Sequence, residues 1–200
     1  TVESVISYCV SKGLKPYYIY GNKYGKGNEK IAVQAYVEAY DEIKEYEKSA
    51  GFKFNYIFHA SGTGTTQAGL ICGKLKHKDK NEVIGISIAR DRQLGVSSID
   101  YMVRSYLEDK NIYWENNHIN FEDQYTCGGY GNKNKKILQT INKVLNSDGI
   151  PLDTIYTGKA FWGMTEYIRD KGIKDARILF IHTGGTPLFF DDLDTNDKEV

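Results

Sequence analysis

The segment FHASGTGTTQAG, residues 58–69, decides the expected fold because it joins a buried type of strand to the start of a helix. Its apolar run ends at a Gly/Ser/Thr turn, and a helical pattern begins directly after that turn. Such a turn presents backbone N–H groups, hydroxyls and a helix N-terminus, which together suit a phosphate. The segment contains neither GK[ST] nor GxGxxG, so nucleoside-triphosphate and dinucleotide loops are both disfavoured. A plain turn in which Ser or Thr caps the helix is the alternative.

Helical and strand patterns alternate outward from this segment. Helical spacing of apolar residues predicts helices over residues 1–14, 33–51, 66–75, 97–108, 133–145 and 158–169. Short apolar runs predict strands over residues 17–20, 54–60, 83–89 and 177–182. This alternation favours a single α/β domain over residues 1–200, with a parallel sheet in a three-layer, Rossmann-like fold and helices on both faces. Ligands of such sheets bind at the carboxyl ends of the strands. The acidic end of the chain, residues 191–200, is expected to be a frayed tail.

Composition argues against several other classes of protein. The 200 residues include 26 basic and 26 acidic side chains, so there is no basic excess that would favour nucleic acid. No apolar run approaches the ~20 residues that cross a bilayer, so no membrane partner is expected. The three cysteines show no CxxC spacing and the four histidines no ligand spacing, so neither a disulfide scaffold nor a metal site is expected. A cytoplasmic protein with a small-molecule ligand is the prediction.

Two further segments carry candidate ligand-binding residues. The strand that ends at His182 is followed by Thr183-Gly184-Gly185, where glycines allow a ligand to approach the backbone closely. The segment IYTGKA, residues 155–160, places Thr157 where it would cap the following helix. From the residues alone, the first could be only a turn and the second only a cap beside a buried Tyr.

Four motifs in one order resemble a known family. The chain contains ASGTGTTQAG (60–69), GGYG (128–131), LDTIYTGKA (152–160) and ILFIHTGGTP (178–187). This series resembles the D-cysteine desulfhydrase and 1-aminocyclopropane-1-carboxylate deaminase family of pyridoxal-phosphate (PLP) enzymes. The resemblance covers nearly the whole chain from residue 15. It implies the large PLP-binding domain of fold type II enzymes, which is similar to tryptophan synthase β, with a small amino acid as substrate and a homodimeric assembly.

The resemblance implies a role for each motif. The family's phosphate cup corresponds to the Gly/Thr loop, and the two tyrosines that line the substrate side correspond to Tyr130 and Tyr156. A phenol there can hydrogen-bond a substrate carboxylate, or move a proton if its pKa is lowered. The cofactor-binding residues implied are Gly62, Thr63, Gly64, Thr65, Thr66, Thr157, Thr183 and Gly184.

The resemblance also implies the reaction. The deaminases have Glu after the second Tyr and Leu after the His, whereas this chain has Thr157 and Thr183, as the desulfhydrases do. A neutral hydroxyl beside the pyridine nitrogen gives a weaker electron sink than a carboxylate, which suits elimination of a good leaving group. The implied reaction is β-elimination of D-cysteine to pyruvate, sulfide and ammonia. Deamination of 1-aminocyclopropane-1-carboxylate and phosphate-ligand binding without chemistry remain the alternatives.

The Schiff-base lysine of the family has no counterpart at a matching position. Gly21-Asn22-Lys23 imitates the family's Gly-Asn-Lys, but Lys15-Pro16-Tyr17 just before it matches a segment well downstream of that lysine. Lys23 is therefore interpreted as a loop charge, and Lys159 does not match the Schiff-base position either. The expectation is a C-terminal portion of such an enzyme that is inert alone, into which residues 1–14 lead from an upstream part.

Overall fold

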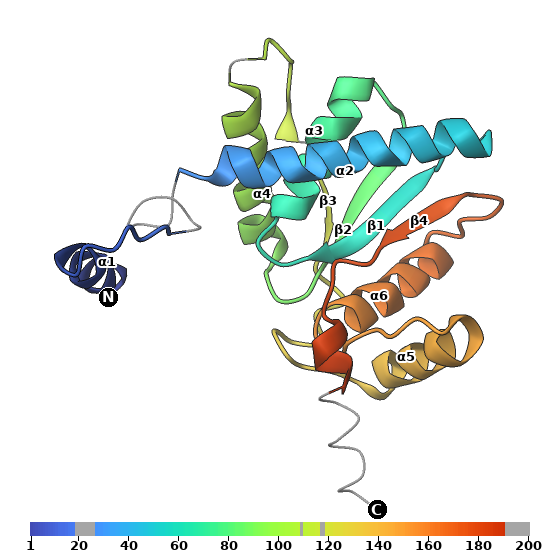
Figure 1. Ribbon diagram of the computed structural model, residues 1–200. Coiled ribbons are helices and arrows are strands. Elements are labelled where there is room, and N and C mark those ends of the chain that lie inside the picture. Colours follow the sequence, from blue (N-terminus) through green and yellow to red (C-terminus); the bar gives the residue numbers. More distant parts are fainter. Residues whose placement is uncertain (19–26, 109, 117–118, 191–200) are drawn as a thin grey trace, which may run out of the picture.

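The computed structural model describes residues 1–18, 27–108, 110–116 and 119–190 (Figure 1). Helices and strands alternate over most of this length, as the sequence pattern predicts. The helices are α1 (Val2–Ser11), α2 (Glu29–Ala50), α3 (Thr65–His77), α4 (Arg92–Leu107), α5 (Lys135–Asp148) and α6 (Thr157–Asp170). The strands are β1 (Tyr56–Ser61), β2 (Glu82–Ser87), β3 (Asn120–Glu122) and β4 (Ile178–Ile181).

The four strands form one parallel sheet in the order β3-β2-β1-β4. In register, Ile57 of β1 lies opposite Val83 of β2 on one side and Leu179 of β4 on the other. The chain runs outward from β1 to β3 and then returns to place β4 on the free side of β1. The order of the strands therefore reverses between β1 and β4.

Helices cover both faces of the sheet, which confirms the predicted three-layer α/β fold. Side chains of β1 alternate between the faces. Ile57 packs in a core cluster with α2, α3 and α4, whereas Phe58 packs in a second cluster with α6. Figure 1 shows α2 and α3 on one side of the strands and α5 and α6 on the other.

Two glycines of α3 bring α2 unusually close. A Cβ at Gly69 would lie 2.3 Å from Cβ of Tyr36, and a Cβ at Gly73 would lie 2.4 Å from Cβ of Tyr40. Any larger residue at either glycine would force the two helices apart. The close approach places Tyr36 of α2 beside the end of β1.

Several boundaries differ from the sequence predictions. α4 begins at Arg92 rather than at residue 97, because the Asp91 carboxylate accepts a hydrogen bond from the Leu94 N–H and caps the helix. β3 was not predicted, since only Phe121 of its three residues is buried. Residues 17 and 18 are not in a strand, and residues 19–20 of that predicted strand lie outside the described residues, as does the tail 191–200. α1 ends at Ser11 and contains no buried residue.

Candidate functional site

The reversal of strand order between β1 and β4 marks the expected ligand position. Loops that follow neighbouring strands diverge at such a point and leave a crevice at the carboxyl edge of the sheet. The loop after β1 is the Gly/Thr segment of residues 62–64, and the loop after β4 begins at His182. The two loops singled out in the sequence therefore flank the same crevice.

A cavity of about 370 Å³ lies at this edge, and side chains from well-separated parts of the chain line it. Six of the ten predicted site residues share it: Gly62, Thr63, Thr66, Tyr130, Tyr156 and Thr183. Its remaining lining residues are Tyr36, Ala60, Ile88, Ala89 and Arg90. Gly64, Thr65, Thr157 and Gly184 are not among the lining residues, but each directly neighbours a lining residue in the sequence.

The Gly/Thr loop ends in a helix N-terminus without a side-chain cap. Gly64 is the N-cap residue of α3 at φ +94°, and no side chain caps the first N–H groups of the helix. The alternative in which Ser or Thr caps this helix is therefore wrong. A Cβ at Gly64 would lie 2.7 Å from Cγ1 of Ile99, so both conformation and space demand glycine there. The uncapped N–H groups are available to an anion.

A cation stands beside this loop. Arg90 follows β2 and donates from Nη1 to the Thr63 carbonyl at 3.1 Å and to Ser98 Oγ at 2.9 Å. The guanidinium is held by these bonds at the cavity wall, where its charge favours an anionic ligand. Arg90 was missed in the sequence because nothing marks the end of β2 as a site; only its place after a buried strand could have indicated it.

The two predicted tyrosines meet directly. Tyr130 Oη and Tyr156 Oη lie 2.6 Å apart, and their rings pack edge to face with centroids 6.0 Å apart. The hydrogen bond with Tyr130, together with burial, raises the pKa of Tyr156 to about 12. Tyr156 is therefore a neutral hydrogen-bonding phenol at physiological pH, and the lowered pKa considered for proton transfer is absent.

Asp153, which the sequence reasoning missed, organises the start of α6. Its carboxylate accepts hydrogen bonds from the N–H groups of Ile155, Tyr156 and Thr157 at 2.6–2.9 Å. The Thr157 hydroxyl donates to the same carboxylate at 2.7 Å and is fully buried. The prediction that Thr157 caps α6 is wrong, because Thr157 is already the first helical residue and Tyr156 occupies the N-cap position. The Thr157 N–H donates instead to Asp153. An Asp four residues before a helical Thr was the available signal.

Asp153 also supports the loop after β4. Gly185 lies so close that a Cβ there would be 2.4 Å from Asp153 Oδ2. In the same loop, the Gly184 N–H donates to His182 Nδ1, and His182 Nε2 lies 2.9 Å from the Pro151 carbonyl. The loop that carries Thr183 and the helix that follows Tyr156 are therefore fixed relative to each other.

Comparison with known proteins identifies the family of this chain. The family model described as pyridoxal-phosphate dependent enzyme matches residues 6–184. The chain belongs to this family. It is 32% identical over 186 residues to a Pyrococcus furiosus protein that is provisionally named 1-aminocyclopropane-1-carboxylate deaminase, covering 92% of this chain and 54% of that protein. It is also 32% identical over 184 residues to a D-cysteine desulfhydrase of Klebsiella pneumoniae, covering 90% of this chain and 53% of that enzyme.

The crystal structure of a homologue of the deaminase confirms the fold of this PLP-family chain. The two superpose with a TM-score of 0.82 at 31% identity, over 99% of this chain and 58% of the other. The chain thus spans about half the length of the curated relatives it matches.

The residues at the carboxyl edge fit the phosphate of PLP. The N-terminus of α3 has uncapped N–H groups, and it begins at Gly64, a position with no room for a Cβ. Together with the Arg90 guanidinium, these groups offer hydrogen-bond donors and positive charge to a dianion. This arrangement is consistent with phosphate binding by the Gly/Thr segment. The individual binding roles stay predictions for Gly62, Thr63, Gly64, Thr65 and Thr66.

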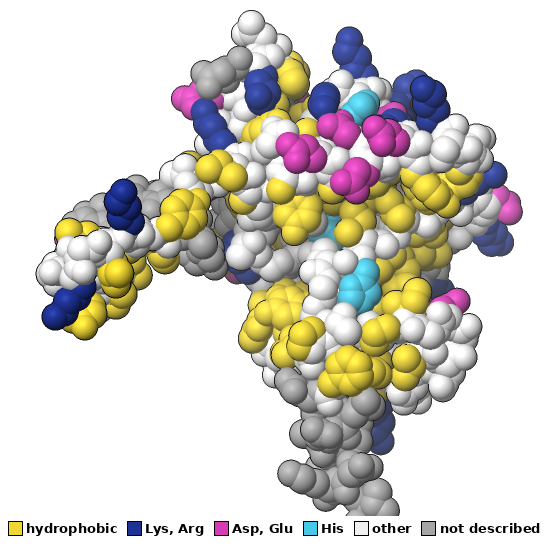
Figure 2. Space-filling view, viewed as in Figure 1, with side chains coloured by type: hydrophobic (Ala, Val, Ile, Leu, Met, Phe, Trp, Pro, Cys, Tyr) yellow, Lys and Arg dark blue, Asp and Glu magenta, His cyan; other side chains and the backbone are white. Residues whose placement is uncertain are grey.

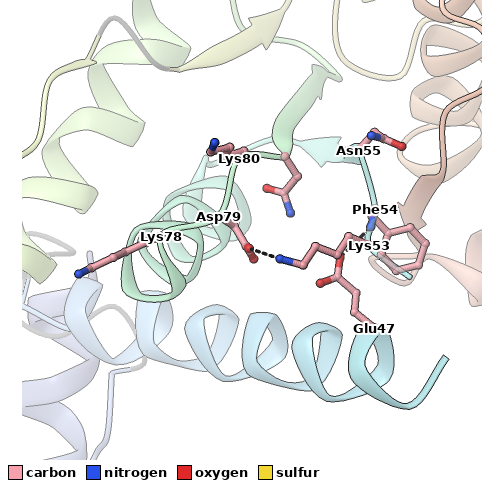
Figure 3. Close-up of a pocket in the computed structure, with 8 residues that line it drawn as sticks. Glu47, Lys53, Phe54, Asn55, Lys78, Asp79 and Lys80 are labelled. Atoms are coloured by element: carbon pink, nitrogen blue, oxygen red, sulfur yellow. Dashed lines mark hydrogen bonds and ion pairs between the residues drawn. The ribbon is translucent and has the colours of Figure 1, made fainter. Parts of the chain in front are cut away.

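A second polar cavity, of about 310 Å³, lies at the opposite, amino end of the strands (Figure 3). Glu47, Lys53 and Asp79 line it, and Figure 3 shows Lys53 directed at Asp79 while Lys78 points away. Asp79 also accepts bonds from Lys44 at 2.6 Å and from the Tyr40 hydroxyl at 3.0 Å. The charge of the Asp79 carboxylate is thus compensated by lysines, and its oxygens accept hydrogen bonds, from within the chain.

Neither a metal cluster nor a membrane span emerges from the described part of the chain. Residues 1–18, 27–108, 110–116 and 119–190 contain no group of three His, Cys, Asp or Glu side chains placed to hold a metal ion. In the same residues, every helix is too short or too polar to cross a bilayer.

Proposed function

We propose that this chain forms the cofactor-phosphate and substrate-facing part of a PLP-dependent lyase of the D-cysteine desulfhydrase type. The observation that carries the proposal is the shared cavity, in which the Gly/Thr loop, the tyrosine pair and Thr183 surround one space. The overall reaction converts D-cysteine and water into pyruvate, hydrogen sulfide and ammonia. Membership in the PLP family and the resemblance to both named relatives support this proposal.

The cofactor, when bound, supplies the electron sink that stabilises negative charge at the α-carbon of the amino acid. The chain's own contribution begins with the phosphate, which the α3 N-terminus and Arg90 would hold. Tyr130 and Tyr156 would donate hydrogen bonds to the substrate carboxylate, since Tyr156 stays protonated well above neutral pH. Thr183 lines the cavity, whereas the Thr157 hydroxyl is buried and bonded to Asp153. A threonine rather than a carboxylate beside the pyridine nitrogen would favour loss of a good leaving group.

A lysine amine is the one catalytic group that the cavity does not offer. Of the described residues that line it, none is a lysine, and Lys23 lies outside the described residues. We therefore propose that the complete active site needs a lysine from beyond this matched region. The homodimer implied by the family resemblance is part of the same proposal, and sedimentation of the purified chain tests it.

The first experiment separates binding from chemistry. The chain is titrated with PLP and with inorganic phosphate, and each affinity is compared with that of Thr66→Val. Binding that weakens in the variant supports the phosphate site, whereas equal binding would contradict it. Borohydride reduction and peptide mapping then identify any lysine attached to PLP; a stoichiometric adduct on Lys23 would contradict the proposed location of the lysine.

The second experiment separates the two named activities. The chain, joined to an upstream segment of the desulfhydrase relative that contains a Gly-Asn-Lys sequence, is incubated with D-cysteine or with 1-aminocyclopropane-1-carboxylate. Pyruvate and sulfide from D-cysteine support the desulfhydrase type. Ammonia from the cyclopropane substrate alone would favour the deaminase, which the name of the Pyrococcus relative suggests for that protein. PLP binding without either product would favour a non-catalytic module.

A further inference from the structure

The most unusual buried group outside the cavity lining is the ammonium of Lys159 in α6. The residue is fully buried, although lysine is rarely found in this state without a counter-charge. Its Nζ donates three hydrogen bonds, to the carbonyls of Ile88 at 3.1 Å, Thr126 at 3.0 Å and Gly129 at 2.8 Å. Among the described residues, no carboxylate lies within ion-pair distance of it.

The three carbonyls come from the two segments that shape one wall of the cavity. Ile88 follows β2 and lines the cavity itself, while Thr126 and Gly129 belong to the turn of residues 126–131 that presents Tyr130. An ammonium has three donors in tetrahedral directions, and here each donor has one acceptor. Lys159 therefore joins α6, the end of β2 and the Tyr130 turn at a single point.

The Tyr130 turn has an unusual backbone conformation, and besides the bonds of Lys159 it is supported by the bond from the Gly129 N–H to the Thr126 carbonyl. Cys127, Gly128, Gly129 and Gly131 all have positive φ, so the backbone conformation of this turn is one that most residues avoid. Tyr130 itself is 59% exposed, and its ring packs edge to face against Tyr156. The bond from Lys159 to Gly129 fixes the backbone directly before Tyr130.

Stability alone does not favour a lysine at this position. Burying an ammonium costs several kcal/mol before its hydrogen bonds offset the loss of water, whereas an apolar side chain of similar length carries no such cost. Burial also lowers the pKa of Lys159, which reflects the same unfavourable desolvation. A charged group in this place is better explained by what it orients.

We propose that Lys159 is a positioning residue: its three carbonyl bonds hold the Tyr130 turn so that Tyr130 meets Tyr156 across the cavity. The importance of that meeting for substrate recognition rests on the proposed function, but the positioning itself does not. The pKa of Tyr156 reports the contact in the absence of cofactor and substrate, because its hydrogen bond with Tyr130 is the largest cause of its raised value.

The test compares Lys159→Met, Lys159→Gln and the wild type, with tyrosines carrying ¹³C at Cζ and their titrations followed by NMR. Lys174→Met is the matched control, since Lys174 is exposed. Tyr130→Phe gives the value of Tyr156 without its partner. We expect the pKa of Tyr156 to fall from about 12 toward the ordinary value of about 10 in Lys159→Met, as in Tyr130→Phe. Lys159→Gln, which keeps two donors, should lie between, and the control should match the wild type.

Two outcomes would overturn the proposal. A folded Lys159→Met protein with an unchanged Tyr156 pKa would assign Lys159 a purely structural role, whatever its melting temperature. Failure of both Lys159 variants to fold would place the residue in the folding core and remove the positioning role. If the Tyr156 pKa falls as expected but the wild type binds no PLP, the proposed function fails and the positioning role stands.

Discussion

The two ends of the parallel sheet both carry polar cavities, and they differ in how their polar groups are satisfied. Five polar side chains at the amino end are linked by hydrogen bonds and ion pairs, and we call them the amino-end cluster: Tyr40, Lys44, Glu47, Asp79 and Asn81. Its carboxylates accept from Lys44, from the Tyr40 hydroxyl and from the Phe54 N–H. Asn81 donates to the Tyr40 hydroxyl at 2.7 Å. Most polar groups of the cluster are paired within it, although the buried Asn81 Oδ1 has no hydrogen-bond partner among the described residues.

At the carboxyl end, donors are held at the cavity wall by a few bonds to the chain, such as those of Arg90 to the Thr63 carbonyl and Ser98. The α3 N-terminus has no side-chain cap, and the two phenols find only each other. The supporting groups are nevertheless rigid, because Asp153 and Lys159 are fully buried and hydrogen-bonded. A satisfied network stabilises the fold, whereas rigid donors that face a cavity favour a ligand. The amino-end network therefore mainly stabilises the fold, whereas the carboxyl end has an arrangement that suits a ligand.

The surface between α2 and β4 differs from both ends of the sheet because it is mostly hydrophobic. Figure 2 shows acidic side chains along α2 and hydrophobic side chains between α2 and β4. A shallow, mostly apolar hollow there is lined by Ala39, Glu42, Ile43, Tyr46, Phe54, Leu179 and Ile181. It lacks the converging polar groups that a specific small-molecule site uses, so it does not compete with the carboxyl-end cavity for the proposed cofactor.

Gly64→Ala should have the largest effect on both stability and PLP affinity. The alanine would be strained at positive φ, and its Cβ would overlap Ile99 beside the carboxyl-end cavity. Positive φ costs an alanine about 1 kcal/mol, and the overlap with Ile99 adds about 2 kcal/mol. We expect the free energy of unfolding to fall by about 3 kcal/mol and PLP affinity to fall at least tenfold. Urea denaturation and PLP titration measure the two effects.

Gly51→Ala is the matched control for that prediction. Gly51 has φ +71° at the end of α2, and nothing lies within 4 Å of a Cβ there. Only the conformational cost of about 1 kcal/mol should remain, with PLP affinity unchanged. Equal losses in the two variants would show that packing around Gly64 does not shape the site.

Asp79→Asn should lower stability without changing PLP affinity, unlike Gly64→Ala, which should lower both. The variant keeps the shape of the side chain but loses its charge toward Lys44, so the unfolding free energy should fall by about 2 kcal/mol. PLP and phosphate affinity should stay within twofold of the wild type, because the amino-end cluster lies at the other end of the strands. A loss of PLP affinity after correction for unfolded protein would contradict the division between the two ends.

Part of the pH dependence of stability should come from Asp79 at the amino end. Burial by itself raises the pKa of Asp79, but hydrogen bonds from Lys44 and Tyr40 outweigh it and hold this pKa below the ordinary value. A lowered folded-state pKa stabilises the protein above about pH 4, and this contribution disappears as pH falls through the folded-state pKa. The stability difference between the wild type and Asp79→Asn should therefore shrink from pH 6 to about pH 3. Denaturation curves across this range that stay parallel would contradict the assignment.

The fold was predictable because its signals are local and repeat along the chain. Strands such as residues 83–87 are short apolar runs between polar turns, and buried parallel strands require that pattern. β3 was not predictable in the same way, because one buried Phe121 between two polar residues carries no periodic signal. Its place is set by pairing with β2, which is a contact between distant parts of the chain.

The site was predictable where a sequence motif lines the cavity. It was less predictable where a residue supports the cavity through hydrogen bonds to other segments. Gly62, Thr63 and Thr66 belong to the Gly/Thr segment at the start of α3, whose composition favours an anion site, and all three line the cavity. Arg90 and Lys159 have no local pattern, since their roles depend on carbonyls that tertiary folding brings to them. Supporting groups of this kind become visible only once the strands and turns are placed in space.

Thr66→Val should have the smallest effect on stability and still separate the two ends. The hydroxyl faces the carboxyl-end cavity, so its loss should leave the unfolding free energy within about 0.5 kcal/mol. It should weaken PLP and phosphate binding by about fivefold, the worth of one hydrogen bond of about 1 kcal/mol. Thr165→Val on α6 is the matched control, because that hydroxyl bonds only the local Trp162 carbonyl in an exposed position. The Thr66→Val binding deficit should be the same in the wild-type and Asp79→Asn backgrounds. A deficit that changes when Asp79 is replaced would show that the two ends are coupled.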